Sequence, residues 1–240
     1  MDPFQPASAP WRSGLRGLRA HFRAGLALQV AALALVLAYY HSAAARDSLD
    51  RLMDFKLRTG FAFGIVSTGL FGGILPYAYL RHEGLKRAGR PRYSWRQGLG
   101  LTAFWAYKGF EVDLFYRILA RTIGAGHDPR TILEKLFTDQ FVYCPAFAVP
   151  VTVAVYQLAD AHGRAGGVAA DLRAPRWYAR RVLPVLISNA GVWIPAVAII
   201  YSLPTPLQLP LQNLVLCFFT LLVAHQMYLE PPAEPGYVRG

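Results

Sequence analysis

Residues 99–119 read LGLTAFWAYKGFEVDLFYRIL, an apolar stretch interrupted by Lys108, Glu111, Asp113 and Arg117. About 20 residues are enough for an α-helix to cross the hydrocarbon core of a bilayer, which is about 30 Å thick. Each charged residue near the bilayer centre costs about 2.5–3.5 kcal/mol on insertion scales. Such a helix cannot expose its middle to lipid, so we expect it to lie at the centre of a helical bundle or to border a water-filled cavity.

The spacing of the four charges predicts two ion pairs on this helix. Lys108 and Glu111 are three residues apart, and Asp113 and Arg117 are four apart, separations that bring side chains together on one helix face. At 100° per residue, the two pairs point in nearly opposite directions. Ionisable residues inside a span indicate function by default, and the alternative is a pair of structural ion pairs with no path for a solute. The sequence leaves both interpretations open.

The rest of the chain predicts that this helix belongs to an all-α, polytopic transmembrane helical bundle. Of the 240 residues, 54% are hydrophobic and 16% are charged, whereas a soluble domain is nearer a quarter charged. The apolar runs are continuous rather than alternating, which excludes β-barrel strands. Six segments of about 20 residues are predicted to be helices: 24–45, 60–80, 99–120, 140–159, 182–203 and 207–229. They form one membrane domain, 24–229, between a basic N-terminal tail, 1–23, and a C-terminal tail, 230–240.

Two of the six segments have alternative interpretations. The arginines before residue 24 and the small residues after the first apolar run are typical of a secretory signal, but the run is nearly a full span, so we expect an uncleaved helix. The last segment carries Gln208, Gln212 and Asn213 at its start. It either crosses fully, as we expect, or is an interfacial or partly re-entrant helix. The three prolines of SLPTPLQLP (202–210) cannot all lie inside one helix, which predicts a tight turn and an antiparallel last pair.

The charges outside the segments predict an orientation. With six crossings, the two tails and the second and fourth loops share one side and carry 16 Lys and Arg residues, against eight on the other side. Cytoplasmic loops are enriched in Lys and Arg, so we expect both termini in the cytoplasm. All but four of the 25 basic residues are arginine, in an Ala-rich chain. This composition favours a bacterial plasma membrane, or an organelle membrane if the chain is eukaryotic.

Polar and small residues in the other segments add expectations about packing. Asp139 and Gln140 begin the fourth segment, where Asp139 is expected to cap the helix because acceptors near an N-terminus satisfy free amides. Pro145 predicts a kink or break in that segment. Asn189, in the middle of the fifth segment, is expected to form an interhelical hydrogen bond rather than a ligand contact. The glycines spaced four apart in GFAFGIVSTGLFGGILPYAYL (60–80) predict close helix packing.

No sequence motif indicates catalysis, a metal or a cofactor. The six histidines are scattered, and HExxH, GxSxG, a Walker loop and GxGxxG are all missing from the chain. Glu111 and Asp113 point away from each other on a helix, so they cannot flank one substrate group, and we expect a protein that is not an enzyme. The formal net charge is +11, and the basic residues that produce it lie between apolar segments. This pattern favours membrane loops over nucleic-acid binding.

Three stretches in the second half of the chain follow a recognisable order. A glycine precedes an aromatic pair, Lys-x-x-x-Asp-Gln precedes a proline, and an asparagine precedes a tryptophan and two prolines. The residues concerned are Gly109, Phe115, Tyr116, Lys135, Asp139, Gln140, Pro145, Asn189, Trp193, Pro195 and Pro204. In this order the chain resembles, over about residues 60–229, the family of the mitochondrial protein Mpv-seventeen and the 22-kDa peroxisomal membrane protein. Phe110 stands where that family usually has proline, and Phe115 where it has tryptophan.

The resemblance implies a small helical channel of the non-selective kind found in organelle membranes. It also implies structural roles for Gly109, Tyr116, Lys135, Pro145, Trp193, Pro195 and Pro204. We therefore expect an integral membrane protein that contacts the lipid bilayer, passes small solutes and can form a homo-oligomer. The candidate path or polar network consists of Lys108, Glu111, Asp113, Arg117, Asp139, Gln140 and Asn189. The alternative is a structural or regulatory membrane protein without a conducting path.

Overall fold

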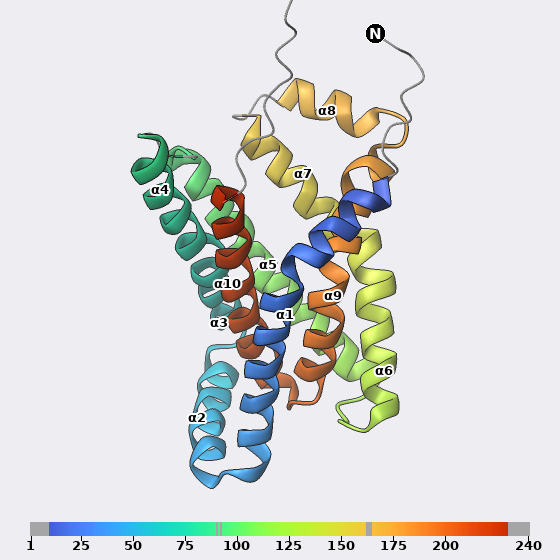
Figure 1. The fold of residues 1–240 in the computed structure, drawn as a ribbon. Helices are drawn as coiled ribbons and strands as arrows, with labels where there is room; N and C mark the ends of the chain where they lie inside the picture. Colours follow the sequence, from blue (N-terminus) through green and yellow to red (C-terminus); the bar gives the residue numbers. More distant parts are fainter. Residues whose placement is uncertain (1–9, 90, 92, 162–164, 230–240) are drawn as a thin grey trace, which may run out of the picture.

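The computed structural model describes residues 10–229, except 90, 92 and 162–164, and this part of the chain is entirely helical (Figure 1). Some of its segments are π-helical and are labelled η. Because α3, η1 and α4 run on without a break, as do α6, η2 and α7, and η3 and α9, the described residues form eight continuous helices. Their elements are α1 (Pro10–His41), α2 (Ala43–Thr59), α3 (Phe61–Thr68), η1 (Gly69–Ile74), α4 (Leu75–Ala88), α5 (Trp95–Thr122), α6 (Pro129–Phe137), η2 (Thr138–Ala148), α7 (Val149–Asp160), α8 (Ala165–Arg173), η3 (Tyr178–Val182), α9 (Leu183–Tyr201) and α10 (Thr205–Leu229).

Three helical stretches of the described chain are long and apolar enough to cross a membrane: Phe61–Lys86, Pro129–Asp160 and Tyr178–Tyr201. Gly25–His41 and Ala43–Thr59 add a fourth if this pair, bent by 102°, counts as one broken span. Helix α5 is also long, but it carries charges in its middle. The all-α class is thus confirmed, and candidate membrane spans are present. The count of six crossings stays a prediction.

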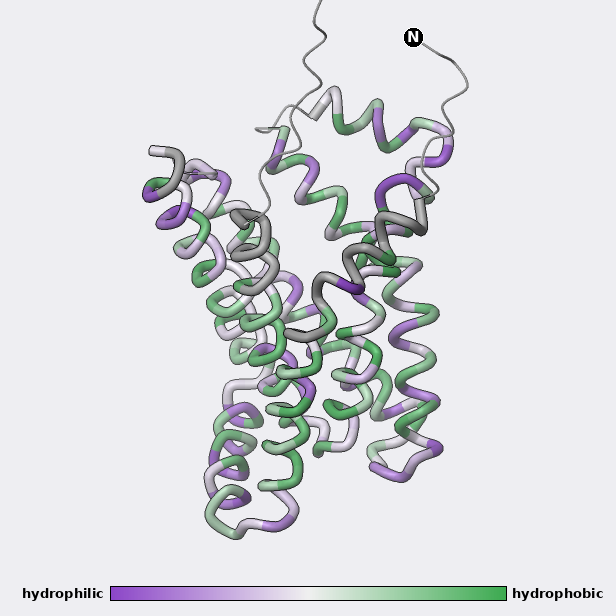
Figure 2. Tube along the Cα trace, in the orientation of Figure 1, coloured by the Kyte–Doolittle hydropathy of each residue, from purple (hydrophilic) through white to green (hydrophobic). Residues whose placement is uncertain are grey.

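The long helices run roughly side by side, and α8 lies across one end of the bundle (Figure 1). The beginning of α1 and the ends of α4, α7 and α10 lie at the upper end in this view. The α1–α2 corner, the α5–α6 connection and the α9–α10 turn lie at the lower end. Figure 2 shows hydrophilic residues concentrated towards these two ends and apolar residues along the helices between them.

The N-terminal part of the chain differs from the prediction. The first helix begins at Pro10 and ends at His41, whereas residues 24–45 were expected, and α2 occupies what was expected to be a loop. The corner between the two helices has specific contacts. The Ser42 hydroxyl accepts a hydrogen bond from the amide of Ala45, which caps α2. The Arg46 guanidinium donates hydrogen bonds to the backbone carbonyls of Tyr39 and Tyr40. These carbonyls have no partner within α1 because they lie at its C-terminal end.

Small residues bring α3 and η1 against α5, as the glycine spacing predicts. A Cβ atom built on Gly109 would collide with the Gly64 carbonyl, and one on Gly69 would lie 3.3 Å from the Ala106 Cβ. Gly60 has a different role from the one predicted. It lies in the turn between α2 and α3 with a φ of +58°, and a Cβ atom added to it would meet nothing within 4 Å. The close contact therefore starts at Gly64 and runs along the helix, holding α5 inside the bundle.

The fourth predicted segment begins earlier than expected. Helix α6 starts at Pro129, and the Asp128 carboxylate accepts a hydrogen bond from the amide of Thr131, 3.1 Å away. The prediction that Asp139 caps this helix is therefore wrong, because Asp139 lies inside the continuous stretch from Pro129 to Asp160. Pro145 neither breaks nor ends that stretch. It lies within η2, a π-helical segment, the kind of distortion that accommodates a proline without its amide donor.

The last two helices form the predicted antiparallel pair (Figure 1). The turn is shorter than the proline-rich stretch suggested, because α10 already begins at Thr205 and contains Pro210. The amide of Leu207 donates to the Pro204 carbonyl at 2.8 Å and starts the new helix. Helix α10 is buried along its first half, with Gln208 and Asn213 each 1% exposed.

Candidate functional site

Helix α5 places the charged residues of the candidate site inside the bundle. It begins with a capping box, in which the Ser94 hydroxyl accepts from the Gln97 amide and the Gln97 side chain accepts from the Ser94 amide. Halfway along it, Lys108 is 5% exposed and Asp113 is 1% exposed. Both ion pairs predicted from the spacing are present, Lys108 with Glu111 and Asp113 with Arg117. Their outside partners lie on different helices, which matches the prediction of two faces.

On the α2 face, Asp113 is bound by two cations. Its Oδ1 lies 2.9 Å from the Lys56 ammonium, and its Oδ2 lies 3.1 Å from the Arg117 guanidinium. The Lys56 side chain is 3% exposed, although its position in the sequence suggested a loop outside the membrane. It was counted among the eight external charges, and that assignment is wrong. The signal that could have found it is the amphipathic pattern of α2, whose charged face otherwise points outward.

On the η2 face, the Lys108–Glu111 pair is joined by Tyr143. The Tyr143 hydroxyl donates to Glu111 Oε1 and accepts a hydrogen bond from the Lys108 ammonium at 3.3 Å. The ring of Phe115 stacks on the Tyr143 ring with centroids 4.0 Å apart, which fixes the hydroxyl towards the pair. Glu111 Oε2 is buried and has no hydrogen-bond partner among the described residues. One oxygen of this carboxylate is therefore used, and the other is free to bind a further polar group.

Asp139 accepts hydrogen bonds from three side chains. The Tyr201 hydroxyl of α9 donates to Oδ2 at 2.6 Å, the Gln140 amide donates to Oδ1 at 3.1 Å, and the Cys144 thiol lies 3.3 Å from Oδ1. The carboxylate is 5% exposed. It ties η2 to the end of α9, because the donor from Tyr201 comes from a residue 62 positions further along the chain.

Lys135 is the one buried ammonium without a hydrogen-bond partner among the described residues. The residue is 1% exposed, and its Nζ lies 5.9 Å from the centre of the Tyr201 ring, within the range of a cation–π contact. Lys135 and Asp139 are four residues apart, a spacing that favours an ion pair. Instead, Tyr201 contacts both residues, offering its ring to the ammonium and its hydroxyl to the carboxylate.

Helix α10 contributes polar contacts that the sequence reasoning did not connect to the site. The Tyr116 hydroxyl hydrogen-bonds Gln212 Oε1. Asn213 accepts from the Thr68 hydroxyl and donates to the Ser67 hydroxyl, both at 2.8 Å. In the sequence, Gln212 and Asn213 stand out only as polar residues at the start of the last apolar segment. Their partners are far away in sequence, so no local pattern could have paired them.

The remaining residues predicted for the site lie outside the charged network. Asn189 is half-buried in α9 and lies outside the hydrogen-bonded network described above. Trp193 packs edge-on against Phe219 with ring centroids 5.8 Å apart. Pro195 is an exposed residue inside α9, and Pro204 lies in the α9–α10 turn. The expected interhelical bond of Asn189 is therefore absent from the described residues.

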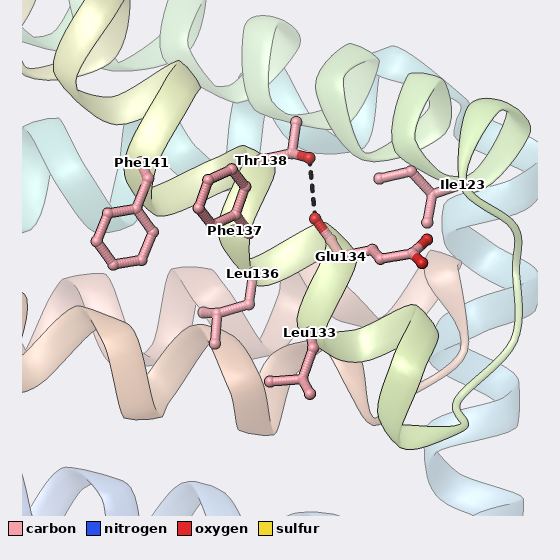
Figure 3. A pocket seen from close by; sticks show the side chains of 7 residues that line it. All are labelled: Ile123, Leu133, Glu134, Leu136, Phe137, Thr138 and Phe141. Carbon is pink, nitrogen blue, oxygen red and sulfur yellow. Dashed lines mark hydrogen bonds between the residues drawn. The ribbon is translucent and has the colours of Figure 1, made fainter.

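The pocket drawn in Figure 3 lies away from the charged network. It is an open groove of about 600 Å³ on the outer side of α6 and η2, beside the end of α5. Its lining is mostly apolar: Ile123, Leu133, Glu134, Leu136, Phe137, Thr138 and Phe141. None of these residues belongs to the charged network. Leu133, Phe137 and Phe141 are each more than half exposed, as expected for side chains facing lipid tails.

Among the residues that the structure describes, no group of three or more His, Cys, Asp or Glu side chains could hold a metal ion. The two cysteines are free thiols in different parts of the bundle. In comparisons with known proteins, the chain matches no family model, no curated protein and no solved structure. The likeness to the Mpv-seventeen family thus stays a prediction from the quoted motifs.

Proposed function

We propose that this protein is an integral membrane protein that passes small solutes, with its path closed in the present conformation. In this proposal α1 with α2, α3–α4, α5, α6–α7, α9 and α10 make six crossings, and both termini lie on the cytoplasmic side of a bacterial plasma membrane. The alternation of the helices between the two ends of the bundle supports this topology (Figure 1). The excess of arginine on the expected cytoplasmic side supports the orientation.

The observation that carries the solute path is the buried network around α5. Five charged residues of this network are buried in a bundle of apolar helices: Lys56, Lys108, Lys135, Asp113 and Asp139. Glu111 and Arg117 complete the network, with side chains that are 10% and 38% exposed. Hydrophobic residues of similar volume would hold helices together at no greater cost in stability than buried ion pairs. Ionisable groups inside a membrane bundle therefore point to a path for polar species.

Two atoms of the network support such a path in particular. Lys135 Nζ and Glu111 Oε2 are buried and lack hydrogen-bond partners among the described residues. An unpaired charged atom in a low-dielectric interior is costly. Water or a polar solute reaching these atoms would relieve that cost. The motif residues Lys135, Asp139 and Gly109, which carry the family likeness, lie in or beside this network, in keeping with a channel of the Mpv type.

The direct test is solute flux from liposomes that contain the purified protein. Vesicles should release small neutral and charged solutes faster than protein-free vesicles. Lys135→Met and Glu111→Gln should change the rate or the charge preference, whereas Arg130→Gln, at a side chain 88% exposed, should leave both unchanged. Flux no higher than that of empty vesicles, from protein with the helical content of the wild type, would refute the channel.

A second candidate is a structural or regulatory membrane protein without a conducting path. The observation that favours it is the complete pairing of Asp113, which is 1% exposed and bound by both Lys56 and Arg117. In that case the network only locks α2 onto α5. Absent flux together with strong energetic coupling between Lys56 and Asp113 in a double-mutant cycle would support this candidate.

Under either candidate we propose no catalytic role and no cofactor. The carboxylates of Glu111 and Asp113 bind partners on different helices, so they do not flank a common substrate position. A homo-oligomer remains part of the proposal, because several helices expose apolar side chains that either lipid or a second copy can cover. Cross-linking in native membranes, followed by mass measurement, tests this.

A further inference from the structure

The connection between two candidate spans has an unusual structure. One span ends at Asp160 and the next begins at Tyr178, so the residues between them lie at the level of the lipid headgroups if both helices cross. Helix α8 lies in this connection and runs across the end of the bundle rather than along it (Figure 1). A helix in this position lies in the plane of the membrane surface.

Asp171 holds α8 in place. Its Oδ2 accepts hydrogen bonds from the Gln157 amide of α7 at 3.0 Å and from the Arg181 guanidinium at 3.2 Å. Its Oδ1 lies 3.7 Å from the Arg180 guanidinium. One carboxylate thus joins α7, α8 and η3, and its charge is shared between two arginines that are each about half exposed. The local charge that remains is positive.

Two more arginines on this surface have no acidic partner in the described part of the chain. Arg173, the last residue of α8, and Arg176 are both exposed, and neither forms an ion pair with a described residue. Arg176 has a φ of +66° and is the one non-glycine residue with positive φ among those described. Glycine would adopt this conformation without strain. The chain therefore keeps a long cationic side chain at a position where the backbone disfavours it.

Aromatic side chains accompany these cations at the same end of the molecule. The Trp177 indole N–H donates to Gln157 Oε1 at 3.1 Å, which fixes the ring beside Arg176. Tyr178 is 41% exposed. Trp95, at the start of α5, is 64% exposed, and the Arg96 guanidinium lies over its ring at 5.4 Å. Tryptophan and tyrosine beside arginine are the residues that proteins place at the headgroup level.

We propose that this surface, formed by Arg173, Arg176, Trp177, Arg180 and Arg181, binds the headgroups of anionic phospholipids. The charge complementarity is direct, because two of its arginines form no ion pair with any residue that the structure describes, and the other two share the Asp171 carboxylate. Leu172, the residue before Arg173 on α8, is 40% exposed, so this surface also carries an exposed apolar side chain. The inference rests on the proposal that the helices cross a membrane, but not on the proposed solute path.

The experiment compares thermal unfolding of the full chain in nanodiscs of phosphatidylcholine with nanodiscs that also contain phosphatidylglycerol. Each arginine near an anionic surface corresponds to a rise of about 2–4 °C in the unfolding midpoint of a chain of this size. We expect the anionic lipid to raise the midpoint of the wild type. The double variant Arg173→Gln/Arg176→Gln should lose most of that rise while unfolding like the wild type in phosphatidylcholine.

Two controls separate a specific lipid contact from general charge effects. Arg121→Gln removes one exposed arginine at the opposite end of α5 and should lose at most the share of a single arginine, much less than the double variant loses. Arg176→Gly relaxes the backbone, so it should match or exceed the wild-type midpoint in phosphatidylcholine and still lose part of the rise. Inorganic phosphate added to phosphatidylcholine discs should not reproduce the effect. Equal midpoints of the wild type in both lipids, or an equal loss with Arg121→Gln, would overturn the proposal, and neither result bears on solute flux.

Discussion

Two buried lysines, Lys56 and Lys135, differ in how their positive charge is compensated. Lys56 is 2% exposed and lies 2.9 Å from Asp113, in a pair that Arg117 completes. Lys135 is 1% exposed and faces the ring of Tyr201, although Asp139 is four residues away on the same stretch of helix. At the first site, which we call the closed site, every charge has an oppositely charged partner. At the second site the ammonium has no hydrogen-bond partner among the described residues.

The difference shows which part of the network can respond to a ligand. The Asp113 carboxylate is bound by two cations and needs no further partner. Breaking these ion pairs costs energy, and the site offers no alternative partner. An ammonium over an aromatic ring has an obvious alternative, the carboxylate of Asp139, which the Tyr201 hydroxyl now occupies at 2.6 Å. We therefore expect the Lys56 site to be structural and the Lys135 site to be the one that changes during function.

The largest effect is expected from removing the carboxylate of the closed site. Asp113→Ala leaves the Lys56 ammonium buried without a partner, and breaking a buried pair in this way costs about 3–5 kcal/mol. Chemical unfolding in detergent, followed by circular dichroism, measures it. The double replacement Lys56→Met/Asp113→Leu removes both charges together and should recover most of that loss. If Asp113→Ala unfolds at the wild-type denaturant concentration, the closed site has no structural role.

The two lysines should respond differently to the same substitution. Lys56→Met leaves Asp113 with Arg117 alone and should destabilise the protein by about 1.5–3 kcal/mol, the worth of a hydrogen bond to a charged group. Lys135→Met removes an unpaired buried ammonium at the loss of one cation–π contact, so its stability should stay within about 1 kcal/mol of the wild type or rise. Equal losses for the two variants would contradict the distinction between the sites.

Tyr201→Phe tests the hydroxyl that separates Lys135 from Asp139. The variant keeps the ring over the ammonium and removes the donor to Asp139 Oδ2, which leaves a buried carboxylate oxygen unsatisfied at a cost of about 1–3 kcal/mol. In the double variant Tyr201→Phe/Lys135→Met, Asp139 loses both the tyrosine donor and the lysine that could replace it. If the lysine swings to Asp139 in Tyr201→Phe, the double variant is less stable than the sum of the two single changes. Strict additivity would show that Lys135 stays where it is.

Much of the fold follows from local patterns. The all-α class follows from hydrophobicity, the ion pairs of α5 from spacing within one helix, and the antiparallel last pair from the prolines that separate its two helices. Glycine spacing also predicted that α3 and η1 pack closely on another helix, apart from Gly60, but it did not predict that this helix is α5. Helix α2 differs from the prediction because its composition is that of a polar loop. Lys56 lies on the face of α2 that packs against the bundle, where Leu49 and Met53 contact the core, and Asp113 of α5 supplies its charged partner.

The site was less predictable because its contacts are long-range. Lys56 meets Asp113, Tyr201 meets Asp139, and Gln212 meets Tyr116, each across a large separation in sequence. No periodicity specifies such partners. The wrong assignment of Asp139 as a cap had a local cause, since the Asp-Pro pair at 128–129, which is a strong start signal for a helix, was passed over for the onset of apolar residues.

The smallest effect is expected at Asp128, the residue that caps α6. It compares this exposed carboxylate with the buried carboxylate of Asp139 on the same helical stretch. Hydrogen bonds from the Thr131 side chain and amide hold the pKa of the exposed Asp128 carboxyl below its ordinary value of 3.8. A depressed carboxyl pKa contributes stability above the unfolded-state pKa, and this contribution is lost as the pH falls through the folded-state value.

The prediction compares the wild type with Asp128→Asn, which retains a good but uncharged cap. At pH 7 the wild type should unfold at a slightly higher temperature, because a carboxylate also interacts favourably with the helix N-terminus. The difference should shrink as the pH falls below about 4, through the unfolded-state pKa and then through the lower pKa of the folded protein. Thermal unfolding across this range measures it, with Arg130→Gln as a neighbouring variant that leaves the cap intact. A difference that does not change with pH would show that α6 is not stabilised by the charge of Asp128.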